Sequence, residues 1–292
     1  MQSICFFSAY FNSPTLPYYI QFYLERLRPY FTEIILLTND DKKLNIDSVK
    51  FLGDNDIKIK YFNNEGWDFG MWQKAILVTE TDNYDRIALV NDSCVLFKNP
   101  ESFFLWLENI DSDFCGMVDS NYPLFHLQSY FLVINKNAIS EVRNFFVANS
   151  LEKNVLDVIN KFEIGLSQHL LKKGYSVNAC YSTSTYNGEF SPAFFMPLKL
   201  IDKGFPLIKK KIFFCSFRRS EFINLFRMKY IFFPSHYVDY IKSKNKDQLG
   251  NLIDFKKVNK SKILDLNFFK INFLTALSFI YQFARKFKND RS

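Results

Sequence analysis

The stretch IALVNDSCVLF, residues 87–97, decides which kind of fold this chain adopts. Its first four residues are aliphatic and partly β-branched, which is typical of a strand buried on both faces of a helix-covered sheet. The apolar run breaks at Asn91-Asp92-Ser93 and then resumes. Ligands of open α/β sheets gather at the carboxyl ends of the strands, so Asp92 is placed to face a ligand. The alternative is that Asp92 only caps a turn, because Asn, Asp and Ser all favour turns.

Strand-like and helix-like segments alternate on the N-terminal side of this stretch. Residues 3–10, 33–38 and 57–62 are predicted strands, and residues 13–30 are a predicted helix with Pro14 near its start. Such alternation predicts βαβ units and therefore an α/β, Rossmann-like fold with a mainly parallel sheet flanked by helices. We expect ligands at the loops that follow the first three strands.

A glycine-rich turn, NNEGWDFG at residues 63–70, leads into a predicted helix over residues 71–80. Gly66 and Gly70 lie on either side of Asp68, so backbone N–H groups and a carboxylate can both meet a ligand here, as suits a nucleotide or its phosphates. Trp67 and Trp72 favour this interpretation, because capping a helix needs no such bulky groups. The alternative is an ordinary helix N-terminus with Asp68 near the cap.

The chain after the central stretch places polar residues within apolar elements. Strands are predicted over residues 114–118, 125–134 and 175–180, and helices over residues 100–109, 140–148 and 155–172. His126 and Gln128 alternate onto one side of their strand, so either they contact a substrate or His126 is an ordinary structural histidine. Glu163 interrupts the apolar side of its helix. Since burying an unpaired carboxylate is costly, Glu163 must be paired, bound to a ligand or exposed in a cleft.

Composition limits the class of protein. The chain has 292 residues, of which 48% are apolar and 18% aromatic, and this is ample for a globular core. Its five cysteines are odd in number and widely spaced, which indicates buried thiols and neither a disulfide framework nor a zinc site. No apolar run reaches the roughly 18 residues of a spanning helix. Met1 leads directly into the first predicted strand, so we expect no export signal.

Charge divides the chain into two parts. Residues 201–292 carry 20 Lys and Arg against 7 Asp and Glu, whereas the first 200 residues carry 17 against 23. A basic tail on an acidic body suggests a polyanionic surface as partner. The tail contains no recognisable nucleic-acid-binding motif, so we expect a membrane and no nucleic acid.

The C-terminal part is predicted to be separate from the α/β domain. Residues 1–240 form the predicted domain, residues 241–265 a linker, and residues 266–292 a basic tail that is an amphipathic helix over residues 266–288. We expect this helix to lie on the inner face of the plasma membrane, and hence the protein to be cytoplasmic and peripheral. The alternatives are a helix that packs back on the domain or one that forms an oligomer contact.

Five motifs, in order and spacing, resemble a known family. They are NEGWDFGMW, LVNDSCVL, HLQSYFLVI, FEIGLSQHLLKKGY and FFPSH. The series resembles the rhamnan synthesis protein F family, rhamnosyltransferase-like proteins of bacterial cell-wall polysaccharide and lipopolysaccharide O-antigen clusters. The resemblance covers roughly residues 3–240 and implies a GT-A-like glycosyltransferase, in which a nucleotide-sugar lies over the carboxyl ends of the strands.

The resemblance also implies roles for the candidate residues. Asp92 takes the place of the acid that binds a metal or the diphosphate, and Glu163 lies near the acceptor as the first choice for a general base. His236 reaches the diphosphate or the metal from the C-terminal side. The other candidates are donor-binding Ser8, Asn39, Gly66, Asp68, Lys74 and Ser93, and substrate-contacting His126, Gln128 and Ser129.

The implied reaction moves a sugar, a deoxyhexose such as rhamnose, from a nucleotide-sugar to a polysaccharide or lipid-linked glycan. The leaving diphosphate needs charge stabilisation, either from Mg²⁺ or Mn²⁺ held by oxygen ligands or from cationic side chains. The family's Asp-x-Asp is here Asn91-Asp92-Ser93, with one carboxylate, so both alternatives stay open. The missing second Asp also permits a non-catalytic sugar-binding or assembly protein. Because each of them interrupts or ends an apolar element, we expect Asp68, Asp92 and Glu163 to converge on one cleft.

Overall fold

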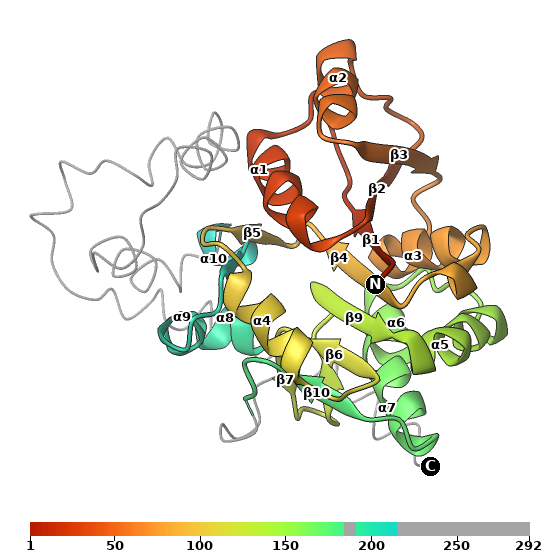
Figure 1. Cartoon of the computed structure of the whole chain (residues 1–292), viewed down its shortest axis with the longest axis vertical. Helices are drawn as coiled ribbons and strands as arrows, with labels where there is room; N and C mark the ends of the chain where they lie inside the picture. The colour runs from red at the N-terminus through yellow and green to blue at the C-terminus, as the bar shows by residue number, and fades with distance from the viewer. Residues whose placement is uncertain (184–190, 215–292) are drawn as a thin grey trace, which may run out of the picture.

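A computed structural model of the chain describes residues 1–183 and 191–214, with a seven-stranded sheet at their centre (Figure 1). The strand order is β10-β6-β9-β4-β1-β2-β3. In this sheet β9 is antiparallel to both neighbours and all other pairs are parallel. The strands are β1 (Ser3–Ser8), β2 (Glu33–Asn39), β3 (Ile57–Phe62), β4 (Arg86–Asn91), β6 (Phe114–Gly116), β9 (Phe131–Asn135) and β10 (Val177–Ala179). The predicted mainly parallel α/β sheet is therefore confirmed.

Helices cover both faces of this sheet. In Figure 1, α1 and α4 lie on one side and α3, α5 and α7 on the other. Successive strand residues point to opposite faces, so β1 contributes Cys5 and Phe7 to one core and Ile4 and Phe6 to the other. The helices are α1 (Tyr18–Leu27), α2 (Ile46–Asp54), α3 (Trp67–Leu77), α4 (Glu101–Asn109), α5 (Lys136–Ala148), α6 (Val155–Val158) and α7 (Gly165–Lys172), with a π-helical segment (Ile159–Ile164) between the last two. Short 3-10 turns follow α1 (Arg28–Tyr30) and α3 (Thr81–Asn83).

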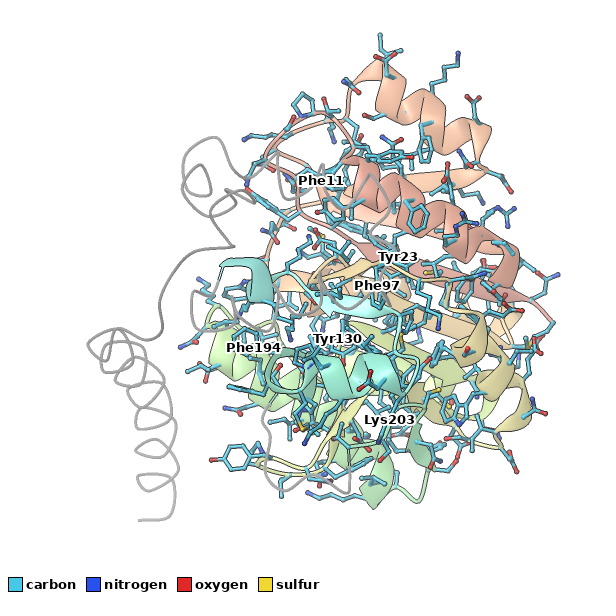
Figure 2. The ribbon with its side chains drawn as sticks, turned by 90° about the vertical axis from the view of Figure 1, so that its left-hand side faces the viewer. Phe11, Tyr23, Phe97, Tyr130, Phe194 and Lys203 are labelled. Carbon is cyan, nitrogen blue, oxygen red and sulfur yellow. The ribbon has the colours of Figure 1, made fainter. Side chains whose placement is uncertain are left out.

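Short elements bring the last described residues back to the end of β4. β5 (Cys94–Leu96) follows the Asp92 turn and pairs antiparallel with β11 (Leu207–Lys209). α8 (Pro192–Phe195) and α9 (Pro197–Asp202) precede β11, and α10 (Lys211–Phe214) follows it. Figure 2 shows this segment, which includes Phe194, over the face that also carries α1, with Tyr130 near it. β7 (Asp119–Ser120) and β8 (His126–Leu127) form another antiparallel pair.

Some predicted elements differ from the observed ones for local reasons. The helix predicted from residue 13 begins at Tyr18, because Pro17 is extended with φ −62° and ψ 142°, and Pro14 therefore lies outside it. The single strand predicted over residues 125–134 is wrong, since β8 pairs with β7 whereas β9 pairs with β4 and β6. α2 is an unpredicted helix, and its N-cap Asn45 accepts a hydrogen bond from the Ser48 N–H.

Several predictions concern residues outside the described part. The domain boundary at 240, the linker, the tail helix over residues 266–288 and His236 all lie there. Cys5, Cys94, Cys115 and Cys180, which lie within the described part, are free thiols, and the first three are buried. Among residues 1–183 and 191–214, no helix has both the length and the apolarity needed to cross a bilayer.

Candidate active site

The candidate residues gather at the edge of the sheet where the parallel strands end. β1 ends at Ser8 and β4 at Asn91, and these two residues are register partners. β9 runs the opposite way, so its first residue, Phe131, pairs with Val90 near the same edge. Residues before β9 therefore lie beside residues after β4. The side-chain amide of Asn91 accordingly donates to the Ser129 carbonyl at 3.4 Å.

A turn before α3 places Asp68 at this edge. Gly66 has φ +74° and Trp67 has φ +52°. Glycine adopts such values readily, but a bulky side chain rarely does, and strained residues of this kind are concentrated at functional sites. Asp68 follows in the first turn of α3, where the Ser8 hydroxyl donates to its carboxylate at 3.1 Å. The Trp67 side chain is 45% exposed beside it.

Gly70 closes this turn, and we expect Gly70→Ala to lower the free energy of unfolding by about 3 kcal/mol or more. A Cβ atom at Gly70 would lie 1.7 Å from the Glu65 carbonyl oxygen, so the backbone of the turn would have to move. Urea denaturation measures the effect. Gly53→Ala in α2 is the matched control, because a Cβ there meets no atom within 4 Å and alanine favours a helix. Equal stability of the two variants would contradict the close approach.

Two further residues hold Asp92. Its Oδ2 atom accepts a hydrogen bond from the Tyr19 hydroxyl at 3.2 Å and forms an ion pair with the Lys210 ammonium group. Lys210 also donates to the Tyr19 hydroxyl at 2.7 Å, so the three side chains form a closed triangle. The side chains of Lys210 and Asp92 are 17% and 19% exposed. In the backbone, the Asp92 N–H donates to the Ser8 carbonyl at 3.1 Å.

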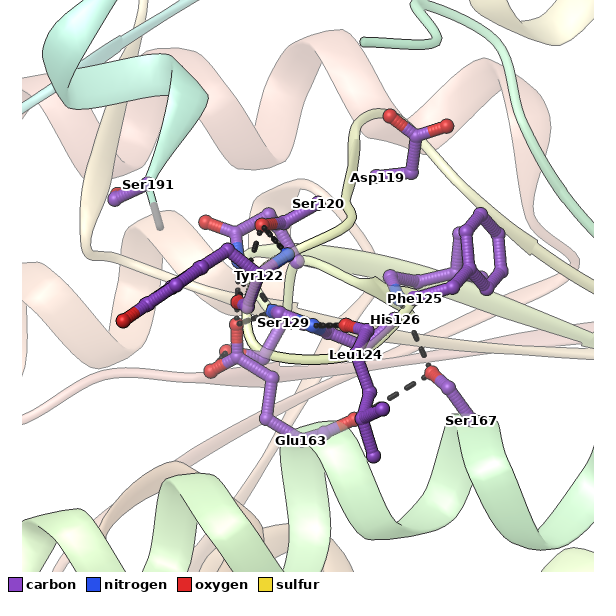
Figure 3. A network of polar contacts seen from close by, with 12 residues as sticks. Asp119, Ser120, Tyr122, Leu124, Phe125, His126, Ser129, Glu163, Ser167 and Ser191 are labelled. Atoms are coloured by element: carbon purple, nitrogen blue, oxygen red, sulfur yellow. Dashed lines mark hydrogen bonds and ion pairs between the residues drawn. The ribbon is translucent and has the colours of Figure 1, made fainter. Parts of the chain in front are cut away.

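A second cluster surrounds Glu163 (Figure 3). The Glu163 carboxylate accepts hydrogen bonds from Gln128 Nε2 at 2.9 Å and from the Ser129 hydroxyl at 3.1 Å. His126 Nδ1 lies 2.8 Å from the Leu124 carbonyl, which fixes the proton on Nδ1 and leaves Nε2 to accept from Gln128 at 2.9 Å. Because Gln128 then donates to both neighbours, the histidine orients the amide and the amide orients Glu163. The Glu163 side chain is 13% exposed.

Glu163 lies in the π-helical segment between α6 and α7. The Gly165 N–H bonds to the carbonyl of Asn160, five residues earlier, as a π-helix requires. The extra residue in this turn rotates the preceding side chains about the helix axis relative to the side chains of α7. Glu163 therefore points to the residues before β9, while Phe162 and Leu166 remain in the core. Such segments are frequent at functional sites.

The charges of the two clusters act on Asp68. Burial and then the charge of Asp92 raise the pKa of Asp68 to about 7, and the charge of Glu163 adds to this. The Ser8 hydrogen bond and the Lys210 charge act in the opposite direction. Asp68, Asp92, Glu163 and Lys210 therefore share one electrostatic environment at the carboxyl edge of the sheet.

We expect Asp68→Asn to reduce the pH dependence of stability. The folded state binds the Asp68 proton more tightly than the unfolded chain, so this group's contribution is complete below about pH 4 and is lost as the pH rises through about 7. Between about pH 5 and pH 8, the free energy of unfolding should fall in both chains, but by about 1 kcal/mol less in the variant than in the unaltered chain. This difference is small because Asp68 is partly solvated, which weakens the effect of its charge. Urea titrations at the two pH values measure this. Asp54→Asn, at the exposed end of α2, is the control, and parallel slopes for all three chains would refute the assignment.

A family model assigns the chain. Residues 35–270 match the model described as rhamnan synthesis protein F. The chain belongs to the rhamnan synthesis protein F family. It is also 29% identical over 161 residues to the virulence protein VirA of Vibrio anguillarum, which covers 52% of this chain and 49% of that protein. The chain thus spans about half the length of the curated relatives it matches.

Three solved structures are similar to this member of the rhamnan synthesis protein F family at low identity. One is a putative glucose-1-phosphate thymidylyltransferase from Bacillus anthracis, with 12% identity, coverage of 62% of this chain and 87% of that one, and a TM-score of 0.43. The second is a putative nucleotide-diphospho-sugar transferase from Desulfovibrio desulfuricans, with 12% identity, coverage of 70% and 96%, and a TM-score of 0.37. The third is a mannose-1-phosphate geranyltransferase from Thermus thermophilus, with 9% identity, coverage of 61% and 74%, and a TM-score of 0.38. These scores are too low to transfer a site.

Other predicted donor-binding residues of this family member have structural partners. Asn39 is fully buried, and its side chain accepts from the Phe11 N–H at 2.9 Å and donates to the Phe11 carbonyl at 3.3 Å. Lys74 donates to the Asn63 carbonyl at 2.9 Å. Ser93 donates its N–H to the Asn91 side chain at 3.0 Å, which forms the turn after β4. Their contact with a donor stays a prediction, as does the part of His236.

The surroundings of Asp92 in this family member do not suit Mg²⁺ or Mn²⁺. Such ions need several oxygen ligands, and residues 1–183 and 191–214 contain no group of three His, Cys, Asp or Glu side chains that could hold a metal. The one carboxylate after β4 already pairs with the Lys210 ammonium. A divalent cation on that carboxylate would lie beside a positive charge.

Sequence reasoning missed Lys210 and Tyr19. Lys210 lies in the run LIKKKIFF. The charge pattern groups this run with the basic residues 201–292, although its apolar flanks indicate a short strand. Tyr19 lies on the apolar side of its helix, where an aromatic residue is ordinary core. A buried carboxylate was also missed: Asp119 accepts from the Ser182 hydroxyl at 2.7 Å and the Thr183 hydroxyl at 2.7 Å, which ties the chain after β10 to β7.

Proposed function

We propose that this protein is a GT-A-like glycosyltransferase that moves a sugar from a nucleoside diphosphate to a hydroxyl group of a growing bacterial surface polysaccharide. The observation that carries the proposal is the placement of Glu163. This carboxylate is held by Gln128 and Ser129 within the electrostatic environment of Asp68, Asp92 and Lys210. A base and a charged cluster at the carboxyl edge of a mainly parallel sheet, in a chain of the rhamnan synthesis protein F family, suit sugar transfer.

In the proposed reaction, Glu163 is the general base of an inverting transfer. The acceptor oxygen forms a bond to the anomeric carbon, while the bond from that carbon to the diphosphate oxygen breaks and its electron pair leaves with the nucleoside diphosphate. The acceptor proton passes to Glu163. Each carboxylate oxygen accepts one described hydrogen bond and has lone-pair capacity for another, so Glu163 can take a proton without losing its orientation.

Donor and acceptor are proposed to meet from opposite sides of this edge. The donor lies toward the Gly66–Asp68 turn and Ser8, where the N-terminus of α3 favours an anion. The acceptor lies toward Glu163, near His126, Gln128 and Ser129. The description of the family, rhamnan synthesis, supports a deoxyhexose such as rhamnose as the sugar. The acceptor that we propose is an O-antigen-type lipid-linked glycan.

A nucleotide-sugar panel tests this function. The full chain is mixed with rhamnose, glucose and mannose donors that carry dTDP, UDP or GDP, and thermal stabilisation is measured first. Donors that stabilise the chain are then incubated with lipid-linked glycan, and released nucleoside diphosphate is quantified. Stabilisation with acceptor-dependent release supports the proposal. Stabilisation without release by any donor favours the non-catalytic sugar-binding alternative. If no donor causes either stabilisation or release, the transferase proposal and the sugar-binding alternative are both contradicted.

We further propose that residues 266–288 bind the inner face of the plasma membrane and bring the site to the lipid-linked acceptor. Each Lys or Arg near an anionic surface adds about 1 kcal/mol of attraction, and the predicted helix is preceded by Lys256, Lys257, Lys260 and Lys262. The full chain should float with anionic liposomes, whereas a chain truncated after Gly250 should not. Neutral liposomes are the control. Equal behaviour of the two chains would show that the tail is not an anchor.

A further inference from the structure

The leaving diphosphate creates a charge that the site must balance. When the bond between sugar and diphosphate breaks, the nucleoside diphosphate gains a negative charge, and a cation beside it lowers the barrier. The charged Asp92 and Glu163 side chains already lie at this edge and would repel a diphosphate, and Asp68, whose pKa is raised to about 7, adds charge as it ionises. The site therefore needs cationic groups that are held in place before the donor binds.

Main-chain pairing holds Lys210 where such a cation is needed. β11 pairs with β5 directly after the Asp92 turn, with Lys209 as the register partner of Cys94. The next N–H, that of Lys210, donates to the Ser93 carbonyl at 3.0 Å. Lys210 is thereby fixed opposite the loop that ends β4, although 118 residues separate it from Asp92.

The side chains of this triangle orient the ammonium group. Asp92 and Tyr19 both accept hydrogen bonds from Lys210 Nζ, and the Tyr19 hydroxyl in turn donates a hydrogen bond to Asp92. An exposed lysine would lose much rotamer entropy on binding an anion, whereas Lys210 is held already. Its side chain is 17% exposed, so the cation is largely desolvated and acts more strongly than it would in bulk water.

The neighbouring lysines extend the positive region. Lys209 Nζ lies 5.5 Å from the centre of the Tyr130 ring and donates to the Ser191 hydroxyl at 3.3 Å. Burial and the charge of Lys209 lower the pKa of Lys211, and the charge of Glu163 raises it, so Lys211 is close enough to interact with both. Lys210 thus contacts Asp92 directly, while Lys211 lies within electrostatic range of Glu163.

We infer that Lys210 binds the diphosphate of the nucleotide-sugar and balances its charge in place of a divalent metal, with Asp92 as the anion that positions the lysine. This inference rests on the proposed glycosyl transfer. It assigns Asp92 a different partner from the one that the family resemblance implies. The bond rearrangement is unchanged: the electron pair still leaves with the diphosphate, and Lys210 transfers no proton.

Nucleotide binding to the full chain tests the inference. UDP, GDP, dTDP and inorganic pyrophosphate are titrated by calorimetry in buffer with EDTA and in buffer with Mg²⁺. The unaltered chain should bind at least one nucleoside diphosphate with the same affinity in both buffers. Lys210→Gln should weaken this binding about tenfold or more, whereas Lys210→Arg, which keeps the charge, should stay within about threefold of the unaltered chain.

The matched control is Lys58→Gln, which removes a lysine paired with Glu33 at 3.0 Å near the opposite edge of the sheet and should leave the affinity unchanged. The EDTA comparison uses the unaltered chain, so it decides even if Lys210→Gln does not fold. Loss of binding in EDTA, or normal binding by folded Lys210→Gln, would overturn the inference and leave the proposed function standing. Absence of binding by every diphosphate in both buffers would overturn the two together.

Discussion

Glu163→Gln is expected to slow sugar transfer by a factor of about 10² to 10⁴, with little change in affinity for the donor nucleotide. The amide cannot take the acceptor proton at neutral pH. It nevertheless keeps the size of the side chain and one oxygen that accepts from Gln128 or Ser129. The measurement is the initial rate of nucleoside diphosphate release with saturating donor and acceptor. Calorimetry with the same nucleotide separates lost chemistry from lost binding.

Glu141→Gln provides a matched control for this variant. Glu141 on α5 is also partly buried, with its side chain 18% exposed. It pairs with His169 at 2.6 Å, just as Glu163 has a histidine, His126, beside it. Both variants remove one carboxylate from a similar environment, but Glu141 does not belong to the cluster at the sheet edge. A rate for Glu163→Gln close to that of Glu141→Gln would remove Glu163 as the base.

Asp92→Asn is expected to reduce transfer by about 10²-fold or more, because the Lys210 ammonium loses the anion that orients it. Asparagine retains an oxygen for the Tyr19 hydroxyl, so the turn after β4 keeps its shape. Breaking the ion pair also leaves a partly buried cation without its partner and should lower the midpoint of thermal unfolding. Transfer rates and unfolding curves are measured on the same preparation.

Asp113→Asn separates the two effects of that change. Asp113 lies just before β6, at the opposite edge of the sheet, and its carboxylate accepts from the Ser176 N–H at 2.9 Å and hydroxyl at 2.8 Å. This variant should lose stability but keep its transfer rate. If both variants lost activity in proportion to stability, Asp92 would be a purely structural residue.

The central strand and its acid were predictable because both follow from short-range pattern. Four aliphatic residues followed by Asn91-Asp92 indicate a buried strand with a polar end. The register of this strand with β1 then brings Ser8 beside Asn91. Glu163 was predictable for a similar reason, since a carboxylate within an apolar helical pattern needs a partner. The partners themselves, Gln128 and Ser129, lie 35 and 34 residues away and depend on the reversed direction of β9.

The lysine opposite Asp92 was not predictable in the same way. Its position depends on a three-residue strand pair, β5 with β11, that no periodicity marks. Its charge was also averaged into a basic tail when the chain was divided by composition. The π-helical segment leaves no clear signal either. The sequence of a helix with one extra residue in a turn has the same pattern as an ordinary amphipathic helix with one polar residue on its apolar side.

The π-helical turn at Ile159–Ile164 ties the direction of Glu163 to the packing of its helix. One residue in an α-helix corresponds to about 100° of rotation, so deleting a single codon in this turn would restore regular winding and swing the upstream side chains by that angle. Leu166 and Leu170 would keep their places in the core while Glu163 turned away from Ser129. The same rotation would carry the buried Phe162 ring out of the core, so a change of one residue in this turn would alter the position of Glu163 and the packing of the domain together.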